Sequence, residues 1–291
     1  MTHKFNTNKN VIIYKLTGGL NHMLSGLNYT YRLALENNCY IIIDSYSWYV
    51  YPFSFCNMFK IHGNVEYYDN YDNIDHNLTW NNIPIKDIIN NRAKWISPNN
   101  YTINNITSDG NKFKNNKLNI IASSGHNWNI NNNDFLYKLK LLPHIINNIE
   151  ANFIPSLQKK LYISVHFRNT DINNDINITI TKIKKAMVYY NIKTVFIATD
   201  DYTAFNAIKD SIKDIDILQY TILEEKNIRN LHYNSINKEK QFYDCLTDIY
   251  HILCSNYFIP SYNSGLSRLI LEMIKIKSNI FNIVSNTIEL N

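Results

Sequence analysis

The stretch "YISVHFRNTD", residues 162–171, runs from an apolar, β-branched segment directly into His166, Arg168 and Asp171. Alternate residues of a strand point to the same side, so His166 and Arg168 share one face while Phe167 faces a core. The planar guanidinium of Arg168 is suited to binding phosphate oxygens. A buried pair between Arg168 and Asp171 that only fixes the loop is the alternative.

The residues around this stretch alternate regularly between strand and helix patterns. We predict strands at 161–167, 194–198, 215–220, 257–260 and 280–284, and helices at 179–190, 202–211, 239–253 and 264–276. Such alternation predicts a parallel sheet with helices on both faces. Ligands bind such sheets at the carboxyl ends of the strands. Three polar clusters, at 166–171, 199–201 and 261–264, fall at these ends and indicate a shared site.

The first half of the chain begins with a β-α-β pattern. A strand at 11–14 is followed by a glycine turn, a helical stripe from Leu20 and a second strand at 39–43. A further strand is predicted at 118–122, and two helical pieces, separated by Pro143, at 135–158. We therefore predict an α/β protein with two domains, residues 1–154 and 155–291. Residues 46–117 show no clear pattern.

Composition excludes several classes of protein. The net charge is +5 and no basic block occurs, so a nucleic-acid partner is not expected. No stretch reaches 18 apolar residues and the first ten are polar, so we expect neither a membrane span nor a signal segment. The four cysteines lack CxxC spacing and are expected to be reduced core thiols. We expect a cytoplasmic protein. Residues with AT-rich codons suggest a low-GC microbe or a large DNA virus as source, and the host cytoplasm in the viral case.

Two other clusters have functional and structural interpretations. In "TVFIATDD", residues 194–201, Thr199 and Asp200 follow a buried strand and either take part in a site or cap the next helix. In "SNYFIPSYNSGLSRLILEM", residues 255–273, donors gather at a helix start, which suits an anion. Ordinary capping by Ser264 is the alternative there. The stretch "TGGLNH", residues 17–22, has similar donors but not the G-x-G-x-x-G spacing.

Together these stretches resemble one family. "YISVHFRNTD", "TVFIATDD" and "DIYHILCSNYFIPSYNSGLSRLILE" follow the order and approximate spacing of three blocks in the α1,2-, α1,6- and protein O-fucosyltransferase superfamily. The H-x-R-x-T-D block is most similar to the α1,6 enzymes and the bacterial nodulation fucosyltransferases. Residues 18–44 are similar to the family's N-terminal loop and helix. The resemblance covers about half of the chain and implies a GT-B-like fold, with two Rossmann-like domains facing across a cleft.

The resemblance also implies roles for individual residues. Arg168 would hold the β-phosphate, His166 the nucleotide, and Asp248 the guanine base, while Asp171 would orient the arginine loop. Asp175 is the carboxylate nearest to the family's catalytic acidic position. The remaining substrate-binding candidates are Gly18, Gly19, Asn21, His22, Thr199, Asp200, Ser261, Asn263, Ser264 and Gly265.

The expected function follows from this resemblance. The protein would transfer fucose from GDP-fucose to a glycan or glycoprotein acceptor, with inversion and without metal or cofactor. The first domain would bind the acceptor and the second the nucleotide sugar. Two alternatives remain open: a transferase using another nucleotide sugar, and a non-catalytic protein that binds glycans or nucleotides. "DID" at 214–216 leads into a predicted strand, which argues against a metal-dependent GT-A transferase.

Overall fold

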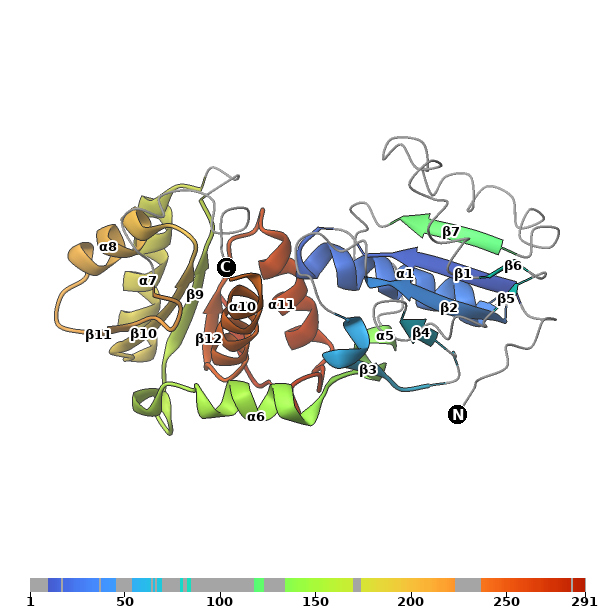
Figure 1. Ribbon diagram of the computed structural model, residues 1–291. Coiled ribbons are helices and arrows are strands. Elements are labelled where there is room, and N and C mark those ends of the chain that lie inside the picture. The colour runs from blue at the N-terminus through green and yellow to red at the C-terminus, as the bar shows by residue number, and fades with distance from the viewer. Residues whose placement is uncertain are drawn as a thin grey trace. The chain divides into compact units, whose positions relative to one another are not determined.

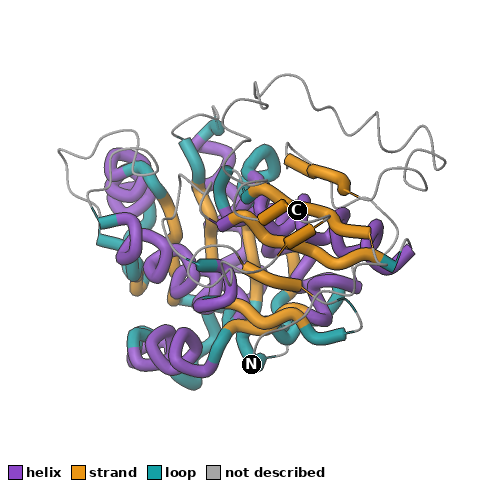
Figure 2. Tube along the Cα trace, turned by 45° about the vertical axis from the view of Figure 1, so that its right-hand side comes forward, coloured by secondary structure: helices purple, strands orange, loops and turns teal. Residues whose placement is uncertain are grey.

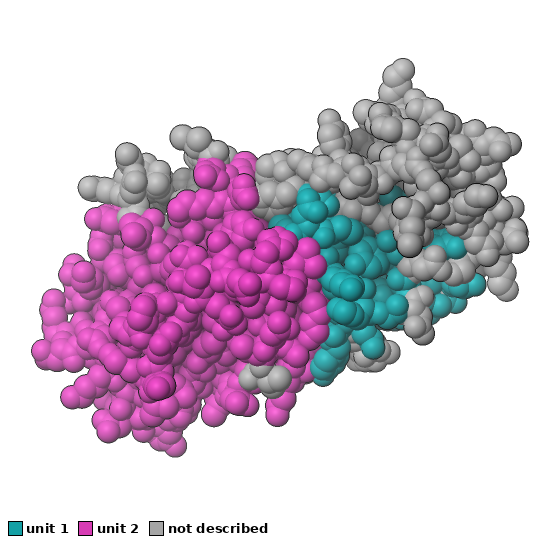
Figure 3. Space-filling view, turned by 60° about the horizontal axis from the view of Figure 1, so that its bottom comes forward, with its two compact units in different colours: residues 1–139 teal, residues 140–291 magenta. Residues whose placement is uncertain are grey.

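The computed structural model describes residues 10–16, 18–36, 38–45, 54–63, 65, 67–69, 79–80, 83–84, 118–122, 134–169, 174–222, 237–283 and 285–290. The chain forms two compact units, residues 1–139 (unit 1) and 140–291 (unit 2), coloured separately in Figure 3. The division falls fifteen residues before the domain boundary placed from the sequence. It does so because the segment before Pro155 belongs to unit 2: α6 (Pro143–Ala151) packs against α10 (Lys238–Leu253) of that unit.

Unit 1 is built on a four-stranded parallel sheet. Its order is β4 (Tyr67–Asp69), β2 (Cys39–Asp44), β1 (Asn10–Lys15), β7 (Leu118–Ala122). Helix α1 (Leu20–Glu36) packs on β1 and β2, and its Leu20, Leu24, Leu27 and Tyr31 are buried as the helical stripe predicts. Leu35, in the last turn, is exposed instead. The smaller elements are η2 (Phe55–Asn57), β3 (Phe59–Ile61), β5 (Thr79–Trp80), β6 (Ile83–Pro84) and α5 (Asp134–Lys138). Strand β8 (Leu139–Leu141) contains the division between the two units.

Unit 2 is built on a five-stranded parallel sheet, drawn in orange with the other strands in Figure 2. Its order is β11 (Asp216–Leu218), β10 (Thr194–Thr199), β9 (Ile163–Phe167), β12 (Tyr257–Ile259), β13 (Ile288–Glu289). The chain winds outward from β9 in one direction and then returns to continue from β12 in the other. The strand order therefore reverses between β9 and β12, which is the point where doubly wound sheets bind ligands.

Helices cover both faces of this sheet. Figure 1 shows α7 (Ile176–Tyr190) and α8 (Tyr202–Ser211) on one side, with α10 and α11 (Gly265–Lys275) on the other. Aliphatic side chains of the strands pack against α7 and α8 in a continuous core. A short 3₁₀ helix, η4 (Pro155–Leu157), precedes β9. The α/β class and the parallel sheet predicted from the sequence are confirmed.

Two predicted elements were wrong. The last strand is β13 rather than 280–284: Ile280 and Phe281 are buried, but Asn282 has a φ of +57°, which extended strands do not adopt. The helical prediction for 135–158 missed β8, whose two buried leucines flank a partly exposed Lys140. Three residues are too few for strand alternation to be recognised from the sequence.

No disulfide bond joins any two of the four cysteines, but only Cys39 is buried and Cys254 is exposed. Core burial was therefore the wrong expectation for the group as a whole. In the described parts of the chain, no helix combines the length and the apolar character needed to cross a bilayer.

Candidate functional site

A cavity of about 200 Å³ lies in unit 2 at the carboxyl ends of β9 and β10. Its walls include His166, the last residue but one of β9, and Arg168 directly after that strand. They also include Thr199, the last residue of β10, Asp200 after it, and Asp248 on α10. Leu266, in the first turn of α11, lines the same cavity. The sheet topology thus brings together five of the residues that the sequence singled out.

Arg168 is paired with Asp200 across the two neighbouring strands. Its Nε lies 4.0 Å from Asp200 Oδ2, and both side chains are mostly buried. The backbone N–H of Asn169 also donates to Asp200 Oδ1, at 3.3 Å. Asp171, the partner considered from the sequence, lies outside the described residues.

Helix α8 is capped by Asp201, so the capping alternative for Thr199 and Asp200 was wrong. Asp201 Oδ1 accepts from the backbone N–H groups of Thr203 (2.9 Å) and Ala204 (3.1 Å). Although burial alone would raise the pKa of Asp201, hydrogen bonds from Thr203, Asn169 and Ala204 lower this pKa below its ordinary value. Asp201 is thus the capping residue of α8, whereas Asp200 lines the cavity.

The start of α11 offers an anion the buried hydroxyl of Ser264 and the first amides of a helix. Ser264 is the N-cap residue and is fully buried, yet its side chain makes no capping bond and its Oγ has no partner among the described residues. Its backbone N–H donates to Ser261 O at 2.8 Å. The first amides of a helix have no intrahelical acceptor and carry its positive dipole end. Capping by the Ser264 side chain is therefore not what the structure shows, and Asn263 beside it is exposed.

A hydrogen-bond network joins the ends of β9 and β12. His166 Nδ1 lies 2.7 Å from Ser267 Oγ, which accepts from Ser261 N–H at 3.0 Å. Asn174 Nδ2 donates to Ser261 Oγ at 2.9 Å and also to the carbonyl oxygen of Arg168. The network fixes the two strand ends at which the order reverses. Sequence reasoning missed Asn174 and Ser267, although Ser267 follows Ser264 by one helical turn.

Asp248 presents a buried carboxylate on α10. Its Oδ2 accepts from Thr221 Oγ1 at 2.7 Å, whereas Oδ1 has no partner in the described part of the chain. Burial, with a smaller contribution from the nearby Asp244, raises the pKa of Asp248 to about 7 against the opposing hydrogen bond from Thr221. Lys240 Nζ bonds Asp244 Oδ2 at 2.5 Å. Thr221, Lys240 and Asp244 were missed, although 240, 244 and 248 follow the i, i+4 spacing of one helix face.

Asp175 lies at the start of α7 and is exposed. Its Oδ1 accepts from Asn177 N–H at 2.8 Å, which makes it the N-cap of that helix. It is not among the described residues that line the cavity. Its catalytic role stays a prediction from the sequence resemblance.

The glycine loop lies in unit 1, after the central strand β1. Gly18 has a φ of +68°, and a Cβ there would lie 3.0 Å from His22 Cβ and Nδ1, so the position requires glycine. Gly19, Asn21 and His22 continue into the first turn of α1. Within unit 1 this loop occupies the carboxyl end of the sheet, next to a helix start.

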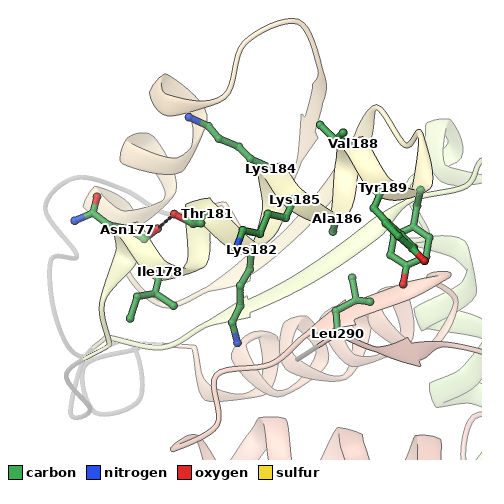
Figure 4. A pocket seen from close by; sticks show the side chains of 11 residues that line it. Asn177, Ile178, Thr181, Lys182, Lys184, Lys185, Ala186, Val188, Tyr189 and Leu290 are labelled. Atoms are coloured by element: carbon green, nitrogen blue, oxygen red, sulfur yellow. Dashed lines mark hydrogen bonds between the residues drawn. The ribbon is translucent and has the colours of Figure 1, made fainter.

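A larger surface groove, of about 1,120 Å³, follows α7 (Figure 4). Its described lining carries Lys182, Lys184 and Lys185 together with Ile178 and Tyr189, but no carboxylate, imidazole or thiol. Groups that transfer protons at neutral pH are thus concentrated in the smaller cavity, which we take as the candidate site.

No grouping of three or more His, Cys, Asp or Glu side chains that could hold a metal ion occurs in the described ranges. The adjacent carboxylates Asp200 and Asp201 are bound instead by Arg168, Asn169 and the first turn of α8.

The chain matches no model of a known protein family, and no curated protein matches its sequence. Solved structures do match. NodZ α1,6-fucosyltransferase soaked with GDP-fucose is 17% identical, with a TM-score of 0.61 over 90% of this chain and 92% of that chain. POFUT1 in complex with GDP-fucose is 9% identical, with a TM-score of 0.61 over 99% of both chains. The chain has the fold of these fucosyltransferases.

NodZ from Bradyrhizobium also matches, at 16% identity and a TM-score of 0.56, over 91% of this chain and 93% of that chain. These matches span residues of both units. The resemblance to α1,6- and protein O-fucosyltransferases that three sequence blocks indicated is therefore confirmed by the structural neighbours.

Proposed function

We propose that this protein is a fucosyltransferase that transfers fucose from GDP-fucose to a glycan or protein acceptor. The observation that carries the proposal is the cavity at the carboxyl ends of β9 and β10 in unit 2. There an arginine after β9, the first turn of α11 and the buried carboxylate of Asp248 on α10 line one cavity. The fold shared with structures that hold GDP-fucose supports the same reading.

The base of the nucleotide is recognised by Asp248. Guanine offers two adjacent donors, N1–H and N2–H₂, to a carboxylate, whereas adenine and uracil cannot offer that pair. Thr221 occupies Oδ2 of Asp248, and the buried Oδ1 has no partner in the described chain. A buried acceptor without a partner is costly unless a ligand satisfies it. The arrangement therefore favours a guanine nucleotide.

The leaving group is stabilised by fixed positive charge. When the bond between fucose C1 and the β-phosphate oxygen breaks, the electron pair and negative charge move to GDP. Arg168 and the first amides of α11 supply donors to that charge without rearrangement. The acceptor hydroxyl forms the new bond to C1 from the opposite face, so the configuration at C1 is inverted.

The proton of the acceptor hydroxyl needs a base, and Asp175 is our candidate. The variant Asp175→Asn tests it cleanly, because asparagine also caps helices and so preserves α7. We expect folded Asp175→Asn protein to bind GDP-fucose normally and to transfer fucose much more slowly. Normal transfer would remove Asp175 from the mechanism.

The proposal assigns a different substrate to each of the two units. Unit 2 would hold the nucleotide sugar, and unit 1 would bind the acceptor and contribute Gly18, Gly19, Asn21 and His22 near the diphosphate. This is the GT-B arrangement, with two Rossmann-like domains facing across a cleft. The sheet topology of unit 2 and the glycine-containing helix start in unit 1 support it.

Titration calorimetry with GDP, UDP and ADP tests the donor assignment. A bidentate contact is worth about 1–3 kcal/mol, so GDP should bind roughly 10- to 100-fold more tightly than UDP or ADP. The Asp248→Ala variant should lose most of this preference. Equal affinity for the three nucleotides in the wild type would contradict the proposal, as would an unchanged preference in the variant.

Hydrolysis of GDP-fucose without acceptor separates an enzyme from a binding protein. We expect slow release of fucose and GDP that continues in the presence of EDTA. Loss of activity in EDTA that manganese specifically restores would instead assign the protein to the metal-dependent transferases.

A further inference from the structure

Helix α7 turns one side to the core of unit 2 and the opposite side to solvent. Ile180, Ile183 and Ala186 belong to that core, together with residues of β9 and β10. The outer face of α7 consists of the residues that line the surface groove of Figure 4: Asn177, Ile178, Thr181, Lys182, Lys184, Lys185, Val188 and Tyr189. The apolar residues of this outer face are not part of the core.

The outer face of α7 exposes large apolar side chains, whereas the outward side of a surface helix is normally polar. The exposed fractions are 56% for Ile178, 84% for Val188 and 81% for Tyr189. No other helix in the described ranges exposes more than one large apolar residue, and α8, in the same layer, exposes none. Apolar side chains gathered on one exposed face and rimmed by polar ones mark an interaction surface.

The charge on this face is of one sign. Lys182, Lys184 and Lys185 line it, and its described lining contains no carboxylate. The helical repeat places Lys182 and Lys184 on the two edges of the face. Figure 4 shows these two side chains pointing to opposite sides of the helix. The carboxylates of Asp175, before the helix, and Glu289, on β13, each accept a hydrogen bond from a neighbouring residue.

We propose that the outer face of α7 binds the surface of a lipid bilayer that contains anionic lipids. Ile178, Val188 and Tyr189 enter the boundary between headgroups and acyl chains, as the apolar side of an interfacial helix does. The tyrosine ring suits this depth because one end is apolar and the other polar. The lysines on the edges lay their alkyl stems along the apolar residues and place their charges at the lipid phosphates.

Two other occupants fit this face less well. A second copy of the chain would set the three lysines against the same three lysines, because a two-fold interface pairs a surface with itself. An acidic peptide helix is held best by a groove with two walls. Here every described lining residue except Leu290 comes from α7 itself. A single exposed helix presents a shallow surface, which suits the plane of a bilayer.

Cosedimentation of the full chain with lipid vesicles, without nucleotide, tests the proposal. One set of vesicles contains phosphatidylcholine alone, and the other replaces about one third of it by phosphatidylserine. We expect the protein to sediment with the second set and to stay in the supernatant with the first. Raising sodium chloride from about 0.1 M to about 1 M shortens the screening length roughly threefold and should release the protein.

Two double variants of equal net charge separate the outer face of α7 from the charge of the whole chain. Lys184→Gln with Lys185→Gln removes two charges from the face. Lys275→Gln with Lys277→Gln removes two from exposed positions at the end of α11, on the other side of the sheet. A lysine near an anionic surface is worth roughly fivefold in affinity, so the first variant should bind roughly 25-fold more weakly. The second should bind nearly as the wild type does.

Insertion of the apolar residues is measured separately. Brominated lipids quench tryptophan only at close range, and the four native tryptophans all precede residue 139. We expect brominated vesicles to quench an additional component in Tyr189→Trp that the wild type lacks. Val188→Gln with Tyr189→Gln should weaken binding roughly tenfold, because less apolar area leaves water.

Failure to sediment with either set of vesicles, or equal sedimentation with both, would overturn the proposal. Equal losses in the two lysine variants would overturn it too, as would bound Tyr189→Trp protein without additional quenching. Binding to soluble polyglutamate but to neither set of vesicles would assign the face to an acidic protein instead.

These outcomes are independent of the proposed function. No residue of the outer face of α7 is among the described residues that line the candidate cavity. All variants should therefore bind GDP as the wild type does, which also confirms that they fold. Absence of GDP binding in the wild type would contradict the proposed function and leave the membrane surface intact.

Discussion

Arg168 has its chemical role set by its immediate neighbours. Asp200 lies beside its guanidinium, and Asn174 binds its carbonyl oxygen. The side chain is therefore held in place before any ligand arrives, which is what electrostatic stabilisation of a leaving group requires.

Replacing Arg168 by alanine should lower the turnover of GDP-fucose by on the order of 10²–10³, by analogy with the loss of one oxyanion donor. Arg168→Lys should recover part of this loss, because lysine keeps the charge but not the planar fork. Arg32→Ala is the matched control: Arg32 pairs with Glu36 on α1, and its loss should leave turnover unchanged. The turnover of GDP-fucose is measured by steady-state kinetics on the three folded variants and compared with that of the wild type. Near-normal turnover in Arg168→Ala would refute its role.

Asp248 should make GDP affinity depend on pH. Burial raises the pKa of Asp248 to about 7, and guanine donates only to the ionised carboxylate. Binding below pH 7 must therefore release a proton, and the affinity should fall as the pH falls through 7. Between pH 8 and pH 6 we expect roughly a tenfold loss that titration calorimetry can measure.

The diphosphate of GDP also titrates near this range, so a control is needed. UDP carries the same diphosphate, and Asp248→Asn removes the titrating carboxylate. The pH profile of UDP affinity for the wild type, or of GDP affinity for Asp248→Asn, is subtracted from that of GDP affinity for the wild type. The difference should be the contribution of the Asp248 carboxylate. A wild-type profile for GDP that is parallel to that of UDP would contradict the assignment.

The junction between β10 and α8 places two adjacent carboxylates in different roles. Asp201 caps the helix through two backbone N–H groups, whereas Asp200 faces Arg168 in the cavity. Neighbouring residues at the end of a strand point to opposite sides, so one carboxylate can serve the element and the other the site.

Alanine at each position should separate these roles. Asp201→Ala should lower the free energy of unfolding by about 1 kcal/mol, the usual value of an N-cap. Asp200→Ala should leave stability nearly unchanged and reduce turnover, because Arg168 loses its orienting partner. Urea unfolding and kinetics are measured on both variants. If Asp200→Ala were the more destabilised and Asp201→Ala the less active, the assignment would have to be reversed.

Unit 2 as a whole depends on a neutral histidine in its core. His251 is fully buried, and its ring stacks on Phe153 and Phe196 at centroid distances of 4.6 and 4.7 Å. Its Nδ1 donates to Thr247 O (2.7 Å), and its Nε2 accepts from Ile154 N–H (3.0 Å). Both nitrogens are satisfied only in the neutral ring, and burial lowers the pKa of His251 to about 4.

Unit 2 should therefore lose stability in mild acid. The pKa of histidine is about 6.5 in an unfolded chain, so the unfolded state binds the proton first as the pH falls. The contribution of His251 is complete above pH 6.5 and is lost between pH 6.5 and 4, by roughly 3 kcal/mol in total. Urea unfolding followed by circular dichroism should show this slope. His251→Gln should flatten it, whereas substitution of the exposed His144 by glutamine should not.

Tryptophan fluorescence gives an internal comparison. All four tryptophans, Trp48, Trp80, Trp95 and Trp128, precede residue 139, so their signal follows unit 1. A pH slope between 6.5 and 5 that appears equally in fluorescence and is retained in His251→Gln would show that His251 is not its cause.

The sequence determined the elements whose signals are local. The helix at 202–211 was predicted at its observed bounds, and β9 and β10 were predicted to within two residues, because periodicity and capping act over a few neighbours. Placing polar clusters at the carboxyl ends of parallel strands was enough to predict that His166, Arg168, Thr199 and Asp200 share a site. The cavity contains all four.

Only the tertiary structure decided which of these groups bind one another. Arg168 pairs with Asp200 on the next strand, and His166 meets Ser267 across 101 residues of sequence. Thr221 reaches Asp248 from the segment after β11. Strand order and helix packing set these distances, and no pattern along the chain records them, because residues far apart in sequence become neighbours only when the sheet forms.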